Sequence, residues 1–232
     1  GTWDGPGTPD WEFKWKKWLY SLPQNVMIPR SIPVMDLEIT AIELHGFADA
    51  SKVGVCAAIY VVVRQGEVTS QGLLTSNSRI AKRDLTIPRL ELVACHMVAN
   101  SLYNVRDALR RFPITTLRGW SDSTVALYWI AGTPSDWKQF VNNRSGKIKK
   151  MKDIIWRHCT TKDNPADIGS RGATKLPKLW FNGTDWLPFP EQYPPNITDT
   201  PDPEEVNPER KVLATPALLA VEEMENPFKD IL

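Results

Sequence analysis

The stretch GFADASKVGVCAAIYVVV, residues 46–63, is the feature that most constrains how this chain can fold. It is largely apolar and ends in a β-branched run, and a short segment with Asp49, Ser51 and Gly54 interrupts it. The pattern predicts a hairpin in which one strand ends near Asp49 and the next begins near Val55. Such a turn is enough to explain an Asp at position 49. If Asp49 is buried instead, it requires polar partners or a metal ion, because an isolated buried carboxylate is costly.

The composition suits one globular domain with flanking segments, since 42% of the 232 residues are hydrophobic and 24% are charged. The three cysteines form no Cys-x-x-Cys pair, which argues against a disulfide framework and against a zinc site, and indicates a reducing compartment. The longest apolar run, residues 53–63, is too short to span a bilayer, and the N-terminus lacks the pattern of a signal peptide. We therefore expect a soluble intracellular protein without a membrane partner.

The central part of the chain, from about residue 37, alternates between strand and helix patterns. We predict strands at about 40–49, 54–63, 67–75, 114–121 and 154–159, and helices at 88–105, 123–131, 136–152 and 165–170. Early hairpins followed by alternating helices and strands predict an α/β fold, with a mixed sheet and helices packed on it.

The two flanks differ from this centre. Near the N-terminus, Trp11, Trp15 and Trp18 recur at i, i+4 and i+7, which places three indoles on one helical face and indicates a core or domain contact. After about residue 185, eleven Asp and Glu stand against three Lys and Arg, and seven prolines lie between residues 188 and 208. Such a segment buries too little apolar surface to offset the entropy of ordering, so we expect a largely disordered linker that is dispensable for folding.

A basic run lies inside the central part. Residues 138–157 contain seven Lys and Arg and one acid, Asp153. The run is either a solvated helix face or a contact with a phosphate backbone, and both interpretations are open at this point. The candidates for nucleic-acid binding are Lys138, Arg144, Lys147, Lys149 and Lys150.

A second candidate carboxylate is Glu91, in TIPRLELVACHMVANSLY at residues 86–103. Helical spacing places it in one row with Cys95, Val98 and Leu102, and this apolar row should face the sheet. An acid near a helix N-terminus is also favoured by the helix dipole, whatever its function.

A third candidate is Asp122, in LRGWSDSTVALYWI, where a predicted strand ends and a helix follows. Asp122 or Ser123 can cap that helix. A carboxylate at the end of a strand can also point into the crevice where open α/β sheets bind ligands. The two interpretations are compatible.

A fourth candidate is Asp167, in WRHCTTKDNPADIGSRG, where Asn164 and Pro165 are typical of a helix start. Together, Asp49, Glu91, Asp122 and Asp167 predict a single site, and four carboxylates cannot all stay ionised at one place without cations. Oxygen ligands without a His or Cys cluster favour magnesium or manganese over zinc. Two such ions about 3.5–4 Å apart are typical of phosphodiester cleavage.

The motifs ELHGFADAS, TIPRLELVA, GWSDSTVALYWI and DNPADIGSRG, in this order, closely resemble the ribonuclease H domain of Bel/Pao-type LTR retrotransposon polyproteins. The resemblance covers about residues 37–187. Residues 1–36 resemble the connector from reverse transcriptase, and residues 188–232 resemble the linker towards integrase. The start at Gly1 and the end at Leu232 fit a slice of such a polyprotein.

The resemblance implies a ribonuclease H-like fold, with a five-stranded mixed sheet flanked by helices. It also implies an endonuclease that hydrolyses the RNA strand of RNA/DNA hybrids during reverse transcription, with two Mg²⁺ or Mn²⁺ ions held by the four carboxylates. The implied partners are the hybrid and the reverse transcriptase and integrase portions of the polyprotein. The implied location is the cytoplasm, in a virus-like particle, or the nucleus.

Two other functions remain as alternatives. The first is a domain that keeps the fold and binds nucleic acid without catalysis. The second is an aspartic peptidase, a label that such Pao segments have carried. The sequence disfavours it, because Asp122-Ser123-Thr124 lacks the glycine of the Asp-Thr/Ser-Gly motif. Cellular ribonucleases H place a mobile His before the last acid, whereas His158 lies in a predicted strand and is expected to be structural, as are His45 and His96.

Overall fold

The stretch at residues 46–63 lies at the centre of the fold in a computed structural model that describes residues 9–25, 27–28, 32, 37–173, 175–196 and 201–211. Strands β1 (Ala41–Ala50) and β2 (Gly54–Gln65) form the antiparallel hairpin that the sequence predicts. Both strands are buried along almost their whole length, because both faces of the sheet are covered.

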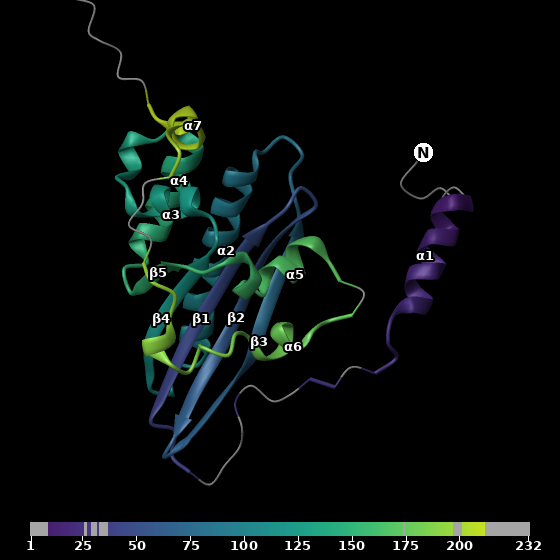
Figure 1. Ribbon diagram of the computed structural model, residues 1–232, viewed down its shortest axis with the longest axis vertical. Helices are drawn as coiled ribbons and strands as arrows, with labels where there is room; N and C mark the ends of the chain where they lie inside the picture. The colour runs from purple at the N-terminus through teal and green to yellow at the C-terminus, as the bar shows by residue number, and fades with distance from the viewer. Residues whose placement is uncertain are drawn as a thin grey trace, which may run out of the picture.

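Five strands form one mixed sheet in the order β3-β2-β1-β4-β5 (Figure 1). Strand β3 (Val68–Ile80) pairs antiparallel with β2. Strand β4 (Ile114–Ser121) is parallel to β1, and β5 (Ile154–His158) is parallel to β4. The predicted α/β class and the five-stranded mixed sheet of a ribonuclease H-like fold are confirmed.

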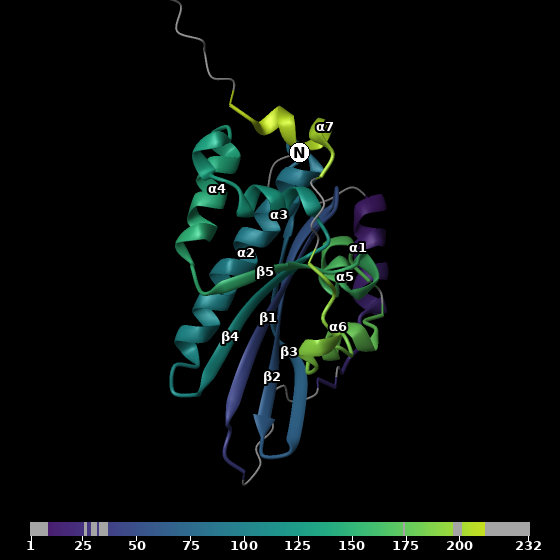
Figure 2. The same cartoon turned by 60° about the vertical axis from the view of Figure 1, so that its left-hand side comes forward.

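Helices cover the sheet on two sides (Figures 1 and 2). One side carries α2 (Ile87–Ala108), α3 (Thr124–Ala131) and α4 (Gln139–Lys150), and the other carries α5 (Ala166–Arg171) and α6 (Lys178–Asn182). Short 3-10 turns lie at Pro134–Asp136, Thr161–Asp163, Pro190–Gln192 and Asn207–Glu209, and α1 (Pro9–Ser21) and α7 (Pro203–Val206) lie near the two ends. Within the described parts of the chain, no helix has the length and apolar character to cross a membrane.

Helix α2 packs closely on β1 because Gly46 has no side chain. A Cβ at Gly46 would lie 2.4 Å from Cγ1 of Val98, so any larger residue would push the helix away. Cys95, Val98 and Leu102, the row predicted to face the sheet, are fully buried. Since Val98 contacts the middle of β1, Glu91 lies two turns earlier, towards the Asp49 end of that strand.

One predicted helix begins later than expected. The sequence predicts a helix from residue 136, whereas the chain makes a 3-10 turn at Pro134–Asp136 and α4 starts at Gln139. Trp137 separates the two because it is extended, forms a β-bridge with Arg210 and buries its indole. The difference therefore arises from a tertiary contact that local periodicity does not report.

The N-terminal helix corrects part of one expectation. The indoles of Trp11, Trp15 and Trp18 share one face of α1, with ring centroids 5.9 Å and 4.9 Å apart along the series. The sequence predicts a core or domain contact for this stripe. Among the described residues it makes no core contact, because all three side chains are about half exposed and α1 has no buried residue, and a contact with another domain stays a prediction. Figure 1 shows the helix apart from the sheet.

The C-terminal flank also corrects an expectation. We expected a dispensable linker from residue 188, yet Tyr193 and Val206 are buried in the two cores and Glu209 is 6% exposed. The described part of this flank therefore packs on the domain, which extends beyond residue 187. Residues 197–200 and 212–232 lie outside the described residues. Composition missed this because a few apolar side chains, spaced far apart among prolines and acids, make the contacts.

The face of the sheet opposite α2 contains a buried ionic cluster. Glu43 on β1 accepts hydrogen bonds from Arg64 at 2.9 Å and from Arg118 at 3.0 Å, and its carboxylate lies 3.8 Å from Nε2 of His45. Burial raises the pKa of Glu43, but the contacts with His45 and Arg64 lower it more, so that it falls to about 2. Burial lowers the pKa of His45, which is completely enclosed.

This cluster predicts how stability depends on pH. The pKa of Glu43 in the folded state, about 2, lies below its usual value of 4.5. Between these two pH values the folded state therefore binds fewer protons than the unfolded state. Its contribution is present above about pH 4.5 and is lost as the pH falls towards 2. We expect Glu43→Gln to lower the free energy of unfolding by roughly 1–3 kcal/mol at pH 7. Thermal melts from pH 7 to pH 2 should show this difference shrinking below pH 4.5, and a difference that stays constant would contradict the assignment.

Candidate active site

Two of the four predicted acids lie at the ends of neighbouring parallel strands, Asp49 as the last residue but one of β1 and Asp122 directly after β4. Ala48 on β1 is in register with Ser121 on β4. The next residues along the sequence, Asp49 and Asp122, therefore lie at the same edge of the sheet. Asp49 is 4% exposed, and Ser170 on α5 donates a hydrogen bond to its carboxylate. The turn explanation of Asp49 is therefore insufficient, because this carboxylate is buried and points at a second element.

The structure separates the two roles proposed for Asp122 and Ser123. Ser123 is the N-cap of α3, and its Oγ accepts a hydrogen bond from the amide of Ala126 at 3.1 Å. Asp122 makes no cap. Its Oδ1 accepts a hydrogen bond from Nδ2 of Asn164 at 3.1 Å. Asp122 is thus available for a role other than helix capping.

Asn164 links three of the acid-bearing segments. Its Nδ2 also donates to the carbonyl of Ala48 at 2.9 Å, and its Oδ1 accepts from the amide of Ala166 at 3.2 Å. The side chain is 1% exposed. One buried amide therefore connects the residue before Asp49, the carboxylate of Asp122 and the residue before Asp167. The sequence identified Asn164 only as a helix start, because these partners lie in three separate segments.

Glu91 reaches the same region from α2. Ser123 donates a hydrogen bond to its Oε2, so the residue that caps α3 also holds this carboxylate. Burial raises the pKa of Glu91 to about 7, with Asp122 and Asp49 adding to the rise and the bond from Ser123 opposing it. Burial likewise raises the pKa of Asp49 to about 6. The hydrogen bond from Ser170 lowers this pKa, and the charges of Asp122 and Asp167 raise it.

Asp167 lies in the first turn of α5, and this helix packs very closely on β2. A Cβ at Gly169 would lie 2.3 Å from Sγ of Cys56, so glycine is required for this approach. Arg171, one turn later, pairs with the carboxylate of Asp167. Asp167 is therefore part of the cluster through its charge, but its nearest partner is a cation of its own helix.

The donor set fits a hard divalent cation by its chemistry. It consists of carboxylates, with no His among them, and the charges of its members raise the pKa of Asp49 and of Glu91. Such all-oxygen sets suit Mg²⁺ or Mn²⁺. Among the described residues, no three Asp, Glu, His or Cys side chains are arranged to hold a metal ion. Each carboxylate is held instead by Ser170, Ser123, Asn164 or Arg171. Each of these contacts uses one carboxylate oxygen, so the other oxygen of each carboxylate can bind a cation while the contacts stay in place.

A basic groove lies along α2, and Leu90, the residue before Glu91, is part of its lining. It has a volume of about 410 Å³ and runs between β3, α2 and α4, next to Leu90. Its polar lining consists of Asn77, Arg79, Lys82, His96, Asn100, Ser101, Asn104 and Arg144, with no carboxylate. Only Arg144 of these was a sequence-based candidate for nucleic-acid binding, because the others come from segments without a basic run.

The structure divides the basic run between two surfaces. The guanidinium of Arg144 lies 3.6 Å from the Phe140 ring and lines the groove beside α2. Lys147 is exposed on the same helix. Burial lowers the pKa of His96, and the charges of Lys147 and Arg144 lower it further. Lys149 lies elsewhere and donates to the carbonyl of Ala131 at 2.9 Å. Lys138 and Lys150 are exposed. Arg144 and Lys149 therefore line two different cavities, and the role of the five candidates in nucleic-acid binding stays a prediction.

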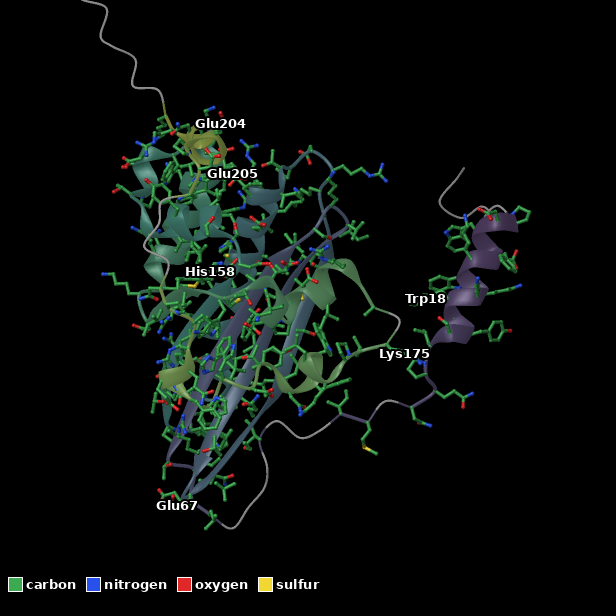
Figure 3. The ribbon with its side chains drawn as sticks, viewed as in Figure 1. Trp18, Glu67, His158, Lys175, Glu204 and Glu205 are labelled. Atoms are coloured by element: carbon green, nitrogen blue, oxygen red, sulfur yellow. The ribbon has the colours of Figure 1, made fainter. Side chains whose placement is uncertain are left out.

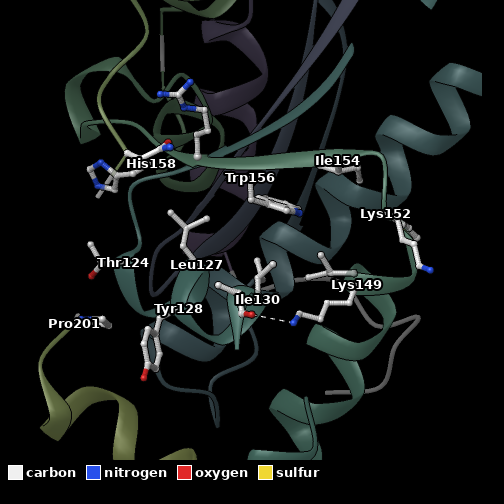
Figure 4. A pocket seen from close by; sticks show the side chains of 15 residues that line it. Thr124, Leu127, Tyr128, Ile130, Lys149, Lys152, Ile154, Trp156, His158 and Pro201 are labelled. Atoms are coloured by element: carbon white, nitrogen blue, oxygen red, sulfur yellow. Dashed lines mark hydrogen bonds between the residues drawn. The ribbon is translucent and has the colours of Figure 1, made fainter. Parts of the chain in front are cut away.

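A larger cavity of about 740 Å³ lies between α3, α4 and β5 (Figure 4). Lys149, Trp156 and His158 line it, and Pro201 lies at one end. None of the four acids lines this cavity. His158 belongs to β5, as the sequence predicts, and is placed at the cavity and not in the acid cluster.

The family model described as Pao retrotransposon-like RNaseH-like domain matches residues 1–123. This interval contains Asp49, Glu91 and Asp122 but not Asp167. No curated protein matches the chain significantly.

Solved structures with similar folds include several ribonucleases H. The LC11 ribonuclease H1 in complex with an RNA/DNA hybrid is 15% identical, with 55% of this chain and 92% of that chain covered and a TM-score of 0.38. Ribonuclease H1 from the archaeon Halobacterium salinarum is 12% identical, with 56% and 93% covered and a TM-score of 0.35. The N-terminal ribonuclease H domain of a Mycobacterium tuberculosis protein is 11% identical, with 56% and 91% covered and a TM-score of 0.36. At these scores, the fold assignment rests on the strand order and on the family model.

Proposed function

The chain belongs to the family of Pao retrotransposon-like RNaseH-like domains, and from this premise we propose that it is a magnesium-dependent nuclease that cleaves the RNA strand of RNA/DNA hybrids during reverse transcription. The observation that carries the proposal is the approach of four carboxylates from separate elements, Asp49, Glu91, Asp122 and Asp167. The charges of Asp122 and Asp167 add to the raised pKa of Asp49, and those of Asp122 and Asp49 add to the raised pKa of Glu91. Reverse transcriptase and integrase portions of the same polyprotein are the proposed protein partners.

The four carboxylates would hold the divalent cations, two in number, with Mn²⁺ able to replace Mg²⁺. Such cations supply Lewis acidity that activates a water molecule and stabilises the leaving oxygen in phosphodiester hydrolysis. Ser123 and Ser170 orient Glu91 and Asp49 by donating hydrogen bonds to them. Asn164 orients Asp122 and fixes its strand against β1.

The basic groove supplies the contact with the nucleic-acid backbone in this proposal. Leu90, the residue before Glu91, lines it, and it brings Arg79, Lys82 and Arg144 together from three segments. Arginine and lysine side chains that neutralise phosphates release counterions, which makes binding depend on salt. The absence of carboxylates from the lining of this groove, and its position on the helix that carries Glu91, support this contact.

A substrate panel tests the proposed function. The full chain is incubated with an end-labelled RNA/DNA hybrid, an RNA duplex and a DNA duplex of the same sequence, with Mg²⁺ or with EDTA. We expect cleavage of the RNA strand in the hybrid, with Mg²⁺ only. Equal cleavage of all three substrates, or cleavage in EDTA, would contradict the proposal.

Asn164→Ala should weaken the use of Mg²⁺ without removing any carboxylate. Residues that orient metal ligands typically contribute 10–100-fold to metal affinity or activity, so we expect the Mg²⁺ concentration for half-maximal cleavage to rise about tenfold or more. The measurement is the initial cleavage rate against Mg²⁺ concentration. The control is Asn143→Ala, because Asn143 is an exposed asparagine on α4. An unchanged Mg²⁺ requirement in Asn164→Ala would reject the orienting role.

A further inference from the structure

The C-terminal flank carries an acidic segment, Asp202–Arg210, which we call the acidic strap. Its acids are Asp202, Glu204, Glu205 and Glu209. The strap contains α7, which lies beside α3 and α4 in both views (Figures 1 and 2). Two backbone hydrogen bonds tie its end to the domain, from the amide of Lys138 to the carbonyl of Glu209 at 2.7 Å and from the amide of Lys211 to the carbonyl of Asp136 at 2.9 Å.

The strap engages a basic residue next to the acid cluster. Nε of Arg89 lies 2.5 Å from Oε1 of Glu209. Arg89 belongs to the first turns of α2, two residues before Glu91, and its guanidinium also lies 5.0 Å from the Phe140 ring. Arg144 stacks on the same ring from the groove side. Arg89 is therefore close in the chain to Glu91 and shares the Phe140 ring with Arg144, a residue of the basic groove.

The ion pair is only partly satisfied. Glu209 is 6% exposed, and its Oε2 is buried with no hydrogen-bond partner among the described residues. A buried pair stabilises a fold only if its remaining lone pairs are satisfied, since both charges lose their hydration. The pairing of Arg89 with Glu209 is therefore a contact that a better anion can replace.

A second acid of the strap faces the cluster. Glu205 is close enough to Glu91 to add to the rise of its pKa that burial causes. Glu204 and Glu205 are labelled on α7 in Figure 3. An anionic segment beside Glu91 repels a phosphate backbone from the same place.

We propose that Arg89 is a phosphate contact for the nucleic acid, and that the carboxylate of Glu209 in the acidic strap occupies it in the free protein and is displaced from it when a nucleic acid binds. The inference rests on the proposed function for its ligand, a polyanionic nucleic-acid backbone. The carboxylate of Glu209 takes the position of a phosphate oxygen on Arg89, so the strap limits the affinity of the resting protein.

The test is the affinity of the full chain for a labelled RNA/DNA hybrid in EDTA, so that cleavage plays no part. We expect Glu209→Gln to tighten binding about 3–10-fold at low salt and to steepen the dependence on salt by about one counterion, because Arg89 becomes free to contact phosphate. Glu204→Gln removes the same charge from an exposed position of the same acidic strap, and we expect it to change affinity less than twofold.

A double variant identifies the residue that gains the contact. In the presence of Arg89→Gln, the change Glu209→Gln should no longer tighten binding. Equal affinities of Glu209→Gln and the unaltered protein would overturn the inference, as would equal gains from Glu204→Gln and Glu209→Gln. A lowered melting temperature of Glu209→Gln without tighter binding would make the pair purely structural. Failure of the proposed function is separate, because it is the absence of Mg²⁺-dependent cleavage in both the unaltered protein and Glu209→Gln.

Discussion

Asp122→Asn should abolish cleavage of the RNA strand in a hybrid, lowering the rate by about a thousandfold or more, equivalent to roughly 4 kcal/mol of transition-state stabilisation. The amide has the shape of the carboxylate and can still accept the hydrogen bond from Asn164. Ser123, not Asp122, caps α3, so the helix keeps its cap. What the variant loses is the negative charge that a hard divalent ion requires.

The matched control is Asp163→Asn, which makes the same chemical change four residues before Asp167. Asp163 accepts a hydrogen bond from Thr160 at 2.8 Å, and an asparagine can accept it as well. We expect this control to cleave like the unaltered protein. We also expect metal-free melting of Asp122→Asn at or above that of the unaltered protein, because fewer carboxylates repel one another. Normal cleavage by Asp122→Asn would remove the central residue of the proposed site.

Truncation after Pro190 should destabilise the domain strongly. It removes Tyr193, whose ring lies 5.3 Å from Trp120 and 5.7 Å from Trp186, and whose hydroxyl donates to the carbonyl of Leu187 at 3.1 Å. It also removes the buried Val206. The loss of one large aromatic and one aliphatic side chain from the cores should lower the free energy of unfolding by about 4–6 kcal/mol. Chemical denaturation followed by tryptophan fluorescence measures it.

Truncation after Lys211 is the control for chain length, because it keeps every contact described above. Tyr193→Phe is the control for the ring, because it removes the hydroxyl alone. We expect the first control to melt like the full chain and the second to lose far less stability than the truncation after Pro190. If the truncation after Pro190 also melts like the full chain, the flank does not contribute to the core, and the original expectation of a dispensable linker would be restored.

The sheet was predictable because its signals are local. The β-branched run of β2, Pro88 at the start of α2 and the apolar row of Cys95, Val98 and Leu102 each report one element without reference to the rest of the chain. The order of these elements then predicts the mixed sheet. The start of α4 was not predictable, because Trp137 leaves the helix for a contact with Arg210, which lies more than seventy residues later.

The acids were predictable as candidates, but their partners were not. Asp49 stands out as a charge in an apolar run, and Glu91 as a charge in an apolar helix row. The hydrogen bonds from Ser170 to Asp49 and from Ser123 to Glu91 join elements that are distant in sequence, so no spacing reports them. For the three Trp residues of α1 the sequence is also insufficient. Their spacing indicates that one helix face makes a contact, but it does not identify what that face contacts.

The measurement that tests the cation site most directly is anomalous diffraction from crystals of this protein soaked in Mn²⁺. The account predicts anomalous peaks among Asp49, Glu91, Asp122 and Asp167, and their loss in crystals of Asp122→Asn. Soaked crystals without a peak at these carboxylates would contradict the account. If such a protein still binds the hybrid, it would instead be a ribonuclease H-like domain that binds nucleic acid without catalysis.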